Sequence, residues 1–275
     1  MKRQKIGFIG GGNMASSLIG GLVSNDYPVD KITVMDLDAE KLAYLDEAFG
    51  VNVTQDMGAL ATSVDVLVLA VKPQNMQRVA EGMALLIKEK PPLIVSIAAG
   101  IRVQALEKWL ESRLPVVRCM PNTPALVKTG ATGLFANAQV SSDQKDQVES
   151  LLRAVGLTVW VDEENELDAV TALSGSGPAY FFMMMEALEA AGIEAGLTQK
   201  TAQLLTQETA LGAAKMALES SESAGVLRER VTSPGGTTER AIGVMEEHQL
   251  REVFRKAVLA AKERSVELSD ELGGS

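Results

Sequence analysis

The chain has 275 residues, enough for one large domain or two ordinary ones, and 46% of them are apolar and 23% charged, as in soluble globular proteins. A net charge of −10 argues against nucleic acid or an anionic membrane as the main partner, because both would repel the chain. The single cysteine, Cys119, excludes an intramolecular disulfide and indicates a reducing compartment, so we expect a cytoplasmic protein. The longest apolar runs, residues 64–71 and 93–101, are too short to span a bilayer.

An apolar segment at residues 6–9 leads into three consecutive glycines. Gly10 permits a sharp turn, and Gly12 lets a pyrophosphate approach the backbone because it has no Cβ. Ala15 is small enough for the next helix, expected over residues 13–24, to pack on the strand. That helix would point free N–H groups and the positive end of its dipole at the phosphates. Alone, the pattern is equally consistent with a glycine-rich turn.

The next predicted strand, residues 31–36, ends in the carboxylate of Asp36. In dinucleotide-binding domains an acid at this place accepts a hydrogen bond from a ribose hydroxyl. The glycines between a strand and a helix, followed by this acid, favour dinucleotide binding over a simple turn.

Strand and helix patterns alternate through the first 160 residues. This alternation predicts a parallel sheet with helices on both faces, and so a Rossmann-like dinucleotide-binding domain over residues 1–162. We expect further strands at residues 51–54, 64–71, 93–98, 116–119, 132–136 and 157–161, and helices at 39–49, 56–62, 73–88, 103–110 and 144–155.

After a polar acidic run at residues 162–166, suited to a linker, no strand pattern follows. Residues 178–195, 199–219 and 250–268 have apolar residues at helical spacing, so residues 163–275 are predicted to form an all-helical domain. The first of these helices is apolar over most of its circumference, and a domain of this size cannot bury it on every side. We therefore expect an obligate homodimer; the alternative is that its methionines fill a core within one chain.

Ligands of such sheets bind at the carboxyl ends of the strands. Residues 70–73, 96–100 and 118–124 are placed there, and small residues such as Ala98 and Gly100 would let a flat ring lie against the backbone. Asn122 and Thr123 can bond a nicotinamide carboxamide or a nearby ribose, although a simple turn is the alternative for this stretch.

Two small-residue loops precede helices of the second domain, at residues 174–180 and 233–239. Successive N–H groups from Gly235 to Thr238 could form a nest for a carboxylate, with ordinary helix capping as the alternative. The only histidine, His248, is interpreted as an exposed structural residue, and no metal site is expected. A dinucleotide enzyme without an evident acid or base suits a cyclic imine, which is readily protonated on nitrogen.

These stretches resemble the pyrroline-5-carboxylate reductase family, and the resemblance covers nearly the whole chain. The resembling stretches are residues 8–14, 70–73, 96–100, 118–124, 174–180 and, most specifically, 231–238. The resemblance implies a Rossmann-like domain, a helical dimerisation domain, and hydride transfer from NADPH or NADH to the C=N carbon of 1-pyrroline-5-carboxylate, which gives L-proline. It also implies larger rings of dimers, commonly decamers.

Carried over residue by residue, the resemblance implies three groups of site residues. Thr238 matches the hydroxyl thought to bond the imine nitrogen, and is the expected catalytic residue. In such dimers the loop that carries it would face a cofactor on the other chain. The implied pyrophosphate site comprises Ile9, Gly10, Gly11, Gly12, Asn13 and Met14; the nicotinamide side Ala70, Val71, Lys72, Pro73, Ala98, Ala99 and Gly100, with Asn122; and the substrate site Ser176, Gly235, Gly236, Thr237 and Thr238.

The sequence departs from the family at Asp36, where many members have a small or neutral polar residue and favour NADPH. Asp36 is followed by Asp38 and Glu40, with only Lys41 to offset them. We expect NADH to be used well and NADPH to lose part of its usual advantage.

Two other function classes fit the domain pattern less well. A β-hydroxyacid dehydrogenase would carry a catalytic lysine on the first long helix of the second domain, and residues 178–195 contain none. A non-catalytic redox sensor would need a partner-binding module, whereas the second domain has the pattern of a dimer core with a substrate loop.

Overall fold

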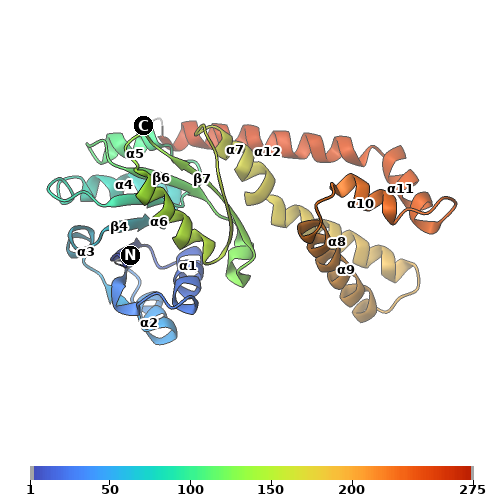
Figure 1. Ribbon diagram of the computed structural model, residues 1–275, viewed down its shortest axis with the longest axis horizontal. Coiled ribbons are helices and arrows are strands. Elements are labelled where there is room, and N and C mark those ends of the chain that lie inside the picture. Colours follow the sequence, from blue (N-terminus) through green and yellow to red (C-terminus); the bar gives the residue numbers. More distant parts are fainter. Residues whose placement is uncertain (1–2, 274–275) are drawn as a thin grey trace. The chain divides into compact units, whose positions relative to one another are not determined.

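The computed structural model describes residues 3–273. The chain forms two compact units (Figure 1). The first contains the chain up to Ser176 together with the segment from Ala260 onward, and the second contains Gly177–Leu259. These limits differ from the division expected at residue 162, because the chain just after that residue stays packed on the sheet and the final helix ends in the first unit.

The first unit is built on one eight-stranded sheet with the order β3-β2-β1-β4-β5-β6-β7-β8. Strand β4 is buried at all four positions, as expected for the centre of a sheet covered on both faces. The strands are β1 (Ile6–Ile9), β2 (Ile32–Met35), β3 (Asn52–Thr54), β4 (Val66–Leu69), β5 (Leu93–Ser96), β6 (Val116–Met120), β7 (Gly130–Ala136) and β8 (Gly156–Trp160).

The prediction of a purely parallel sheet is wrong at one pair, because β7 runs antiparallel to β6 while all other neighbours are parallel. The connection between β6 and β7 contains only the short 3₁₀ helix η2 (Thr123–Val127). A parallel partner needs a crossover of a dozen or more residues, so this short connection returns the chain in the opposite direction.

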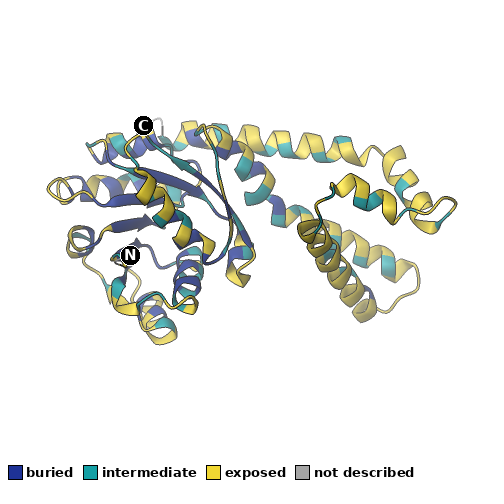
Figure 2. Cartoon of the chain, viewed as in Figure 1, coloured by how far each residue is buried: buried dark blue, intermediate teal, exposed yellow. Residues whose placement is uncertain are grey.

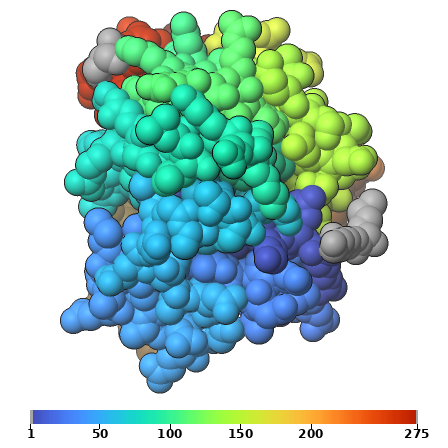
Figure 3. Space-filling model, turned by 90° about the vertical axis from the view of Figure 1, so that its left-hand side faces the viewer, coloured from blue at the N-terminus to red at the C-terminus, as the bar shows by residue number. Residues whose placement is uncertain are grey.

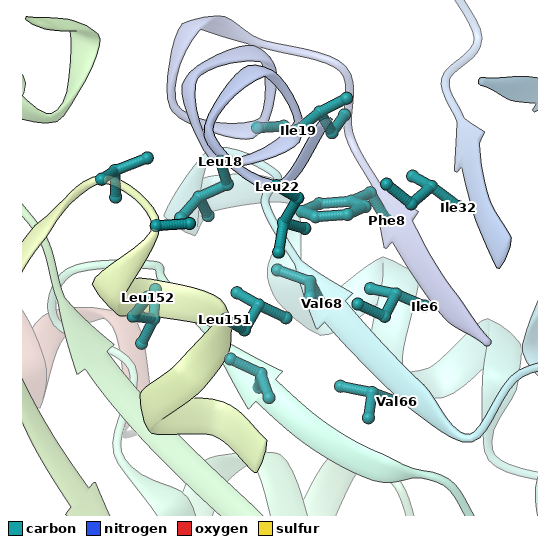
Figure 4. Close-up of a cluster of buried hydrophobic side chains, with 14 of the residues drawn as sticks. Ile6, Phe8, Leu18, Ile19, Leu22, Ile32, Val66, Val68, Leu151 and Leu152 are labelled. Carbon is teal, nitrogen blue, oxygen red and sulfur yellow. The ribbon is translucent and has the colours of Figure 1, made fainter. Parts of the chain in front are cut away.

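Helices cover both faces of the sheet, as predicted. On one face, α1, α2 and α6 pack on the central strands; Figure 4 shows α1 and α6 meeting over Phe8 and Val68. On the other face, α3, α4 and α5 form a second core with Leu67 and Ile94. In Figure 3 the blue and teal segments of α2, α3 and α4 lie toward the viewer. These helices are α1 (Asn13–Ser24), α2 (Ala39–Phe49), α3 (Met57–Ser63), α4 (Pro73–Met83), α5 (Val103–Trp109) and α6 (Ser142–Arg153).

Two local predictions need correction. The helix expected over residues 73–88 ends at Met83 and continues only as turns. The acidic run at residues 162–166 is not a free linker: Glu164 accepts hydrogen bonds from the backbone N–H of Val103 at 2.7 Å and from Arg118 Nη1 at 2.6 Å. Arg118 is a buried cation on β6, and because a buried charge needs a partner, this pair fixes the acidic run to the sheet.

The last helix, α12 (Leu250–Gly273), ends against the first unit. Ser265 Oγ donates to Asp168 Oδ1 at 2.7 Å, and the buried Asp168, on α7 (Glu166–Val170), also lies 3.6 Å from Arg102. Leu268 and Leu272 pack beside Gly100. The C-terminal end of α12 thus supports the segment that follows β5.

The second unit is helical throughout, as predicted. It contains α8 (Gly177–Glu194), α9 (Gln199–Glu219), α10 (Ala224–Arg230), which the sequence analysis did not predict, and α11 (Thr237–Glu247), followed by the first turns of α12. Gly192 of α8 lies against Ala202 of α9, where a Cβ would come 3.2 Å from the alanine methyl. None of the helices in the described part of the chain combines the length and apolar character needed to cross a membrane.

Large apolar side chains of α8 and α9 are exposed in the single chain, and these helices are mostly yellow in Figure 2. On α8, Phe181, Phe182 and Met183 are 56%, 64% and 73% exposed. Exposed apolar area on this scale marks an interaction surface, so one chain alone does not bury this helix.

Candidate active site

The turn from β1 into α1 can be made only by glycine. Gly10 has φ +102°, and a Cβ there would lie 2.6 Å from the carbonyl oxygen of Ala70. The backbone around it is fixed, because the Gly10 N–H donates to Met35 O and the Ala70 N–H donates to Ile9 O, both at 2.8 Å. The carboxyl ends of β1, β2 and β4 therefore meet at this turn.

Gly12 stands directly before α1, and the space around it is open. A Cβ at Gly12 would meet no atom within 4 Å. No side chain caps α1 and its first turn has no acid, so its first N–H groups, including those of Asn13 and Met14, have no partner from the helix or from a cap. An open backbone with free helix N–H groups fits the pyrophosphate of a dinucleotide.

The Asp36 carboxylate is held against the glycine turn. Its Oδ2 accepts the Gly11 N–H at 2.7 Å, its Oδ1 accepts the Asp38 N–H at 3.0 Å, and Lys41 Nζ lies 3.9 Å from Oδ2. Partial burial alone would raise the pKa of Asp36, but the N–H groups of Gly11 and Asp38, with Lys41, outweigh it and hold the pKa below its usual value. Asp36 is therefore an anion at neutral pH, placed where a ribose hydroxyl could donate to it.

The residues expected on the nicotinamide side follow two neighbouring strands, β4 and β5. Ala70 and Val71 leave β4, Lys72 precedes α4, and Pro73 is the first residue of that helix. Ala98, Ala99 and Gly100 follow β5, and Gly100 has φ +75°. Since β4 and β5 are parallel, both segments lie at the same edge of the sheet as Gly10.

Asn122 and Ser176 are placed differently from expectation. Asn122 is buried, with 8% of the residue exposed; its Oδ1 accepts the Ala131 N–H at 2.9 Å and its Nδ2 donates to Ser174 O at 3.0 Å. The amide thus ties β7 to the segment after α7. That segment is a π-helical turn, η3 (Thr171–Gly175), rather than the expected loop, and the Ser176 N–H closes it on Thr171 O at 2.8 Å.

The second predicted loop, in the other unit, begins with a type II β-turn. The Gly236 N–H donates to Ser233 O at 3.0 Å, Pro234 occupies the second position, and Gly235 occupies the third with φ +72°. Gly236 is the N-cap of α11, and Thr237 and Thr238, the first residues of that helix, are exposed. The sequence analysis did not single out Glu239, whose Oε2 accepts the Gly235 N–H at 2.7 Å; an acid in a first helical turn is the signal that could have found it.

Histidine, cysteine and metal-ligating groups are the other candidates for catalysis. His248 is exposed at the end of α11, as predicted. Among the described residues, no group of three or more His, Cys, Asp or Glu side chains is arranged to hold a metal ion. Cys119 is buried on β6, and its pKa is raised by burial, so its thiol is not a nucleophile at neutral pH.

The strand order, the glycine turn and the carboxylate after β2 define the class: a dinucleotide-binding protein with a Rossmann-like domain. Comparison with known families agrees. Residues 5–100 match the family described as NADP oxidoreductase, coenzyme F420-dependent, and residues 164–268 match pyrroline-5-carboxylate reductase dimerisation.

Individual relatives cover the whole chain. A pyrroline-5-carboxylate reductase of Pseudomonas aeruginosa is 50% identical over 99% of this chain and 100% of its own. The solved structure of a pyrroline-5-carboxylate reductase from Coxiella burnetii is 50% identical, with a TM-score of 0.94 over 98% and 99% of the two chains. The solved structure of a pyrroline carboxylate reductase from Plasmodium falciparum, with NADP bound, is 28% identical, with a TM-score of 0.85 over 98% and 99% of the two chains. The chain belongs to the pyrroline-5-carboxylate reductase family.

Gly10 and Gly12 are expected to have separate roles, and substitution of each residue tests this. We predict that Gly12→Ala leaves the thermal unfolding midpoint unchanged, since its Cβ meets open space, but weakens dinucleotide binding by about tenfold or more, because that space is needed by the pyrophosphate. Calorimetric titration with NADH and NADPH measures this. Gly10→Ala is the contrasting variant and should lower the midpoint. Unchanged cofactor affinity in Gly12→Ala would contradict the pyrophosphate assignment.

Proposed function

We propose that the chain carries out its family's reaction, the reduction of 1-pyrroline-5-carboxylate to L-proline, with a nicotinamide dinucleotide held by the first unit and the substrate held by the loop before α11. The observation that carries the proposal is the set of preformed backbone donors at the starts of α1 and α11, one suited to a pyrophosphate and the other to a carboxylate. The family match over residues 164–268 supports it.

In the first unit, the N–H groups at the start of α1 would hold the pyrophosphate, and Asp36 a ribose hydroxyl. The segments after β4 and β5 would line the nicotinamide. When bound, the cofactor supplies the hydride that reduces the C=N carbon. The contribution of these residues is to fix the dinucleotide at one edge of the sheet.

At the start of α11, Thr237 and Thr238 offer N–H groups to the substrate carboxylate, beside the glycines Gly235 and Gly236 of the preceding loop. Ser176 is also assigned to the substrate site. The Thr238 hydroxyl is exposed and bonds to none of the described residues, so it is free to bond the imine nitrogen. The substrate would bind as the iminium or take its proton through Thr238 and water. No histidine, lysine or metal is required for this step.

The choice between NADH and NADPH depends on Asp36. A 2′-phosphate about 4 Å from this carboxylate would be repelled by up to ~4 kcal/mol at an effective dielectric of 20, before screening by solvent and salt. The carboxylate cannot turn away freely, because it accepts two backbone N–H groups. Lys41 is half-exposed and lies 3.5 Å from Asp38 Oδ2, so it offsets only part of the local negative charge. We therefore propose that NADH is used well.

The chain is a homo-oligomer through its dimerisation domain. We propose a homodimer that covers the exposed side chains of α8, and a decamer as the larger assembly implied by the family resemblance; the molar mass in solution distinguishes them. The net charge of −10 supports the absence of a nucleic-acid or membrane partner, and the single buried cysteine supports a cytoplasmic location.

Removing the Asp36 carboxylate should change cofactor preference. In Asp36→Ser, the ratio of kcat/KM for NADPH to that for NADH should rise by about 10- to 100-fold, because the repulsion of a 2′-phosphate and the acceptor for a ribose hydroxyl are both lost. Asp38→Ser is the matched control: it removes the same charge nearby, and serine can still cap α2. An equal shift in both variants would mean that general charge, and not Asp36, sets the preference.

Substitutions of Thr238 test its proposed part in the chemical step. If its hydroxyl bonds the imine nitrogen in the transition state, Thr238→Ala should lower kcat by about 10²-fold, as expected for the loss of one oriented donor. Thr238→Ser, which keeps the hydroxyl, should recover most of the rate. A loss below about threefold in Thr238→Ala would reduce Thr238 to a helix-terminal residue with no part in the step.

A further inference from the structure

The type II turn at Ser233–Gly236 uses two of the four N–H groups expected to bind the substrate carboxylate. The Gly236 N–H is bonded to Ser233 O and the Gly235 N–H to Glu239 Oε2. The N–H groups of Thr237 and Thr238 remain, because the first residues of a helix have no acceptor within it. Two adjacent N–H groups are enough for the two oxygens of one carboxylate.

Burial does not force the contact between Glu239 and Gly235. Glu239 is exposed in the first turn of α11, where it could extend into water, yet its carboxylate returns to the Gly235 N–H at 2.7 Å. A hydrogen bond between an ionised carboxylate and a backbone N–H is among the stronger ones available at a surface.

This contact fixes the part of the turn that is freest to move. Types I and II of a β-turn differ by a flip of the central peptide, here Pro234–Gly235, and in type II the third residue has a positive φ. The bond to Glu239 holds the N–H of that peptide, and Gly235 has φ +72°. The other end of the loop is fixed at α10, since Thr232 Oγ1 donates to Arg228 O at 2.6 Å. With both ends held, the start of α11 is preformed.

We propose that Glu239 is a positioning residue: it locks the Ser233–Gly236 turn so that the N–H groups of Thr237 and Thr238 are free and oriented before the substrate carboxylate arrives. This inference rests on the proposed function, because it takes the loop before α11 as the substrate loop. Without Glu239 the loop would have to become ordered during binding, and the free-energy cost of that ordering would weaken substrate affinity.

A competing role for the same contact is obstruction. The Glu239 carboxylate could occupy the Gly235 N–H that the substrate needs, and its charge would then oppose the substrate's. The two roles predict opposite changes in KM when the side chain is removed.

Steady-state kinetics of Glu239→Ala and Glu239→Gln in the full-length enzyme test the proposal. In Glu239→Ala, KM for 1-pyrroline-5-carboxylate should rise about 5- to 10-fold while kcat stays within about twofold, since an interaction with equal effect on the bound substrate and the transition state is lost. Glu239→Gln keeps an oxygen acceptor and should restore KM to within about twofold of wild type. Cofactor affinity should not change in either variant.

Glu247→Ala is the matched control, since it removes an exposed carboxylate from the far end of the same helix and should leave KM unchanged. A fall of KM in Glu239→Ala would overturn the proposal in favour of obstruction. An unchanged KM with a lowered unfolding midpoint would reduce Glu239 to a helix cap. Thr238→Ala, measured in parallel, distinguishes failure of the proposed function from failure of the positioning role. If neither Thr238→Ala nor Glu239→Ala affects catalysis, the assignment of the substrate loop is wrong. If Thr238→Ala affects catalysis and Glu239→Ala does not, only the positioning role of Glu239 is wrong.

Discussion

The close approach of the Gly10 backbone to the carbonyl oxygen of Ala70 is the constraint on which the proposed cofactor site depends. It requires a residue without a Cβ in a left-handed conformation, and it brings the ends of β1 and β4 together. From this turn follow the open start of α1, the reach of Asp36 to the Gly11 N–H, and the placement of the segment after β4 at the same edge. Larger side chains in the turn would fill the space that a dinucleotide needs, so the proposed cofactor site is formed mainly by the backbone.

The second unit also relies on backbone donors. The start of α11 offers N–H groups and two threonine hydroxyls, and the described residues hold no metal cluster. Backbone donors suit the recognition of a carboxylate, and an iminium needs little help with protons because its nitrogen already carries one. In this view the protein contributes orientation, which can supply a large part of the acceleration of a hydride transfer between two bound reactants. We propose that cofactor selection by Asp36 and loop order from Glu239 adjust that orientation through single carboxylates.

The sequence predicted most of the fold because strands and helices have distinct apolar spacing, and because Gly10, Gly12 and Asp36 have a physical reason to stand where they do. It failed where a short connection or a distant contact decides the local structure. The antiparallel direction of β7 depends on the short η2 connection. Glu164 accepts a hydrogen bond from the buried Arg118, and the Asn122 amide is hydrogen-bonded to backbone groups of β7 and of the segment after α7. None of these contacts leaves a periodic signal in the sequence. The turn at Ser233–Gly236 was visible as a loop, but the contact of Glu239 with Gly235 emerges only from three-dimensional geometry.

The most direct test of the central claim is the initial rate of NADH and of NADPH oxidation by the purified protein, followed by the absorbance of the reduced nicotinamide, with and without 1-pyrroline-5-carboxylate and with proline measured as the product. The account predicts oxidation that saturates with the imine, yields one proline for each nicotinamide oxidised, and proceeds well with NADH. Binding of either dinucleotide without imine-dependent oxidation would contradict it.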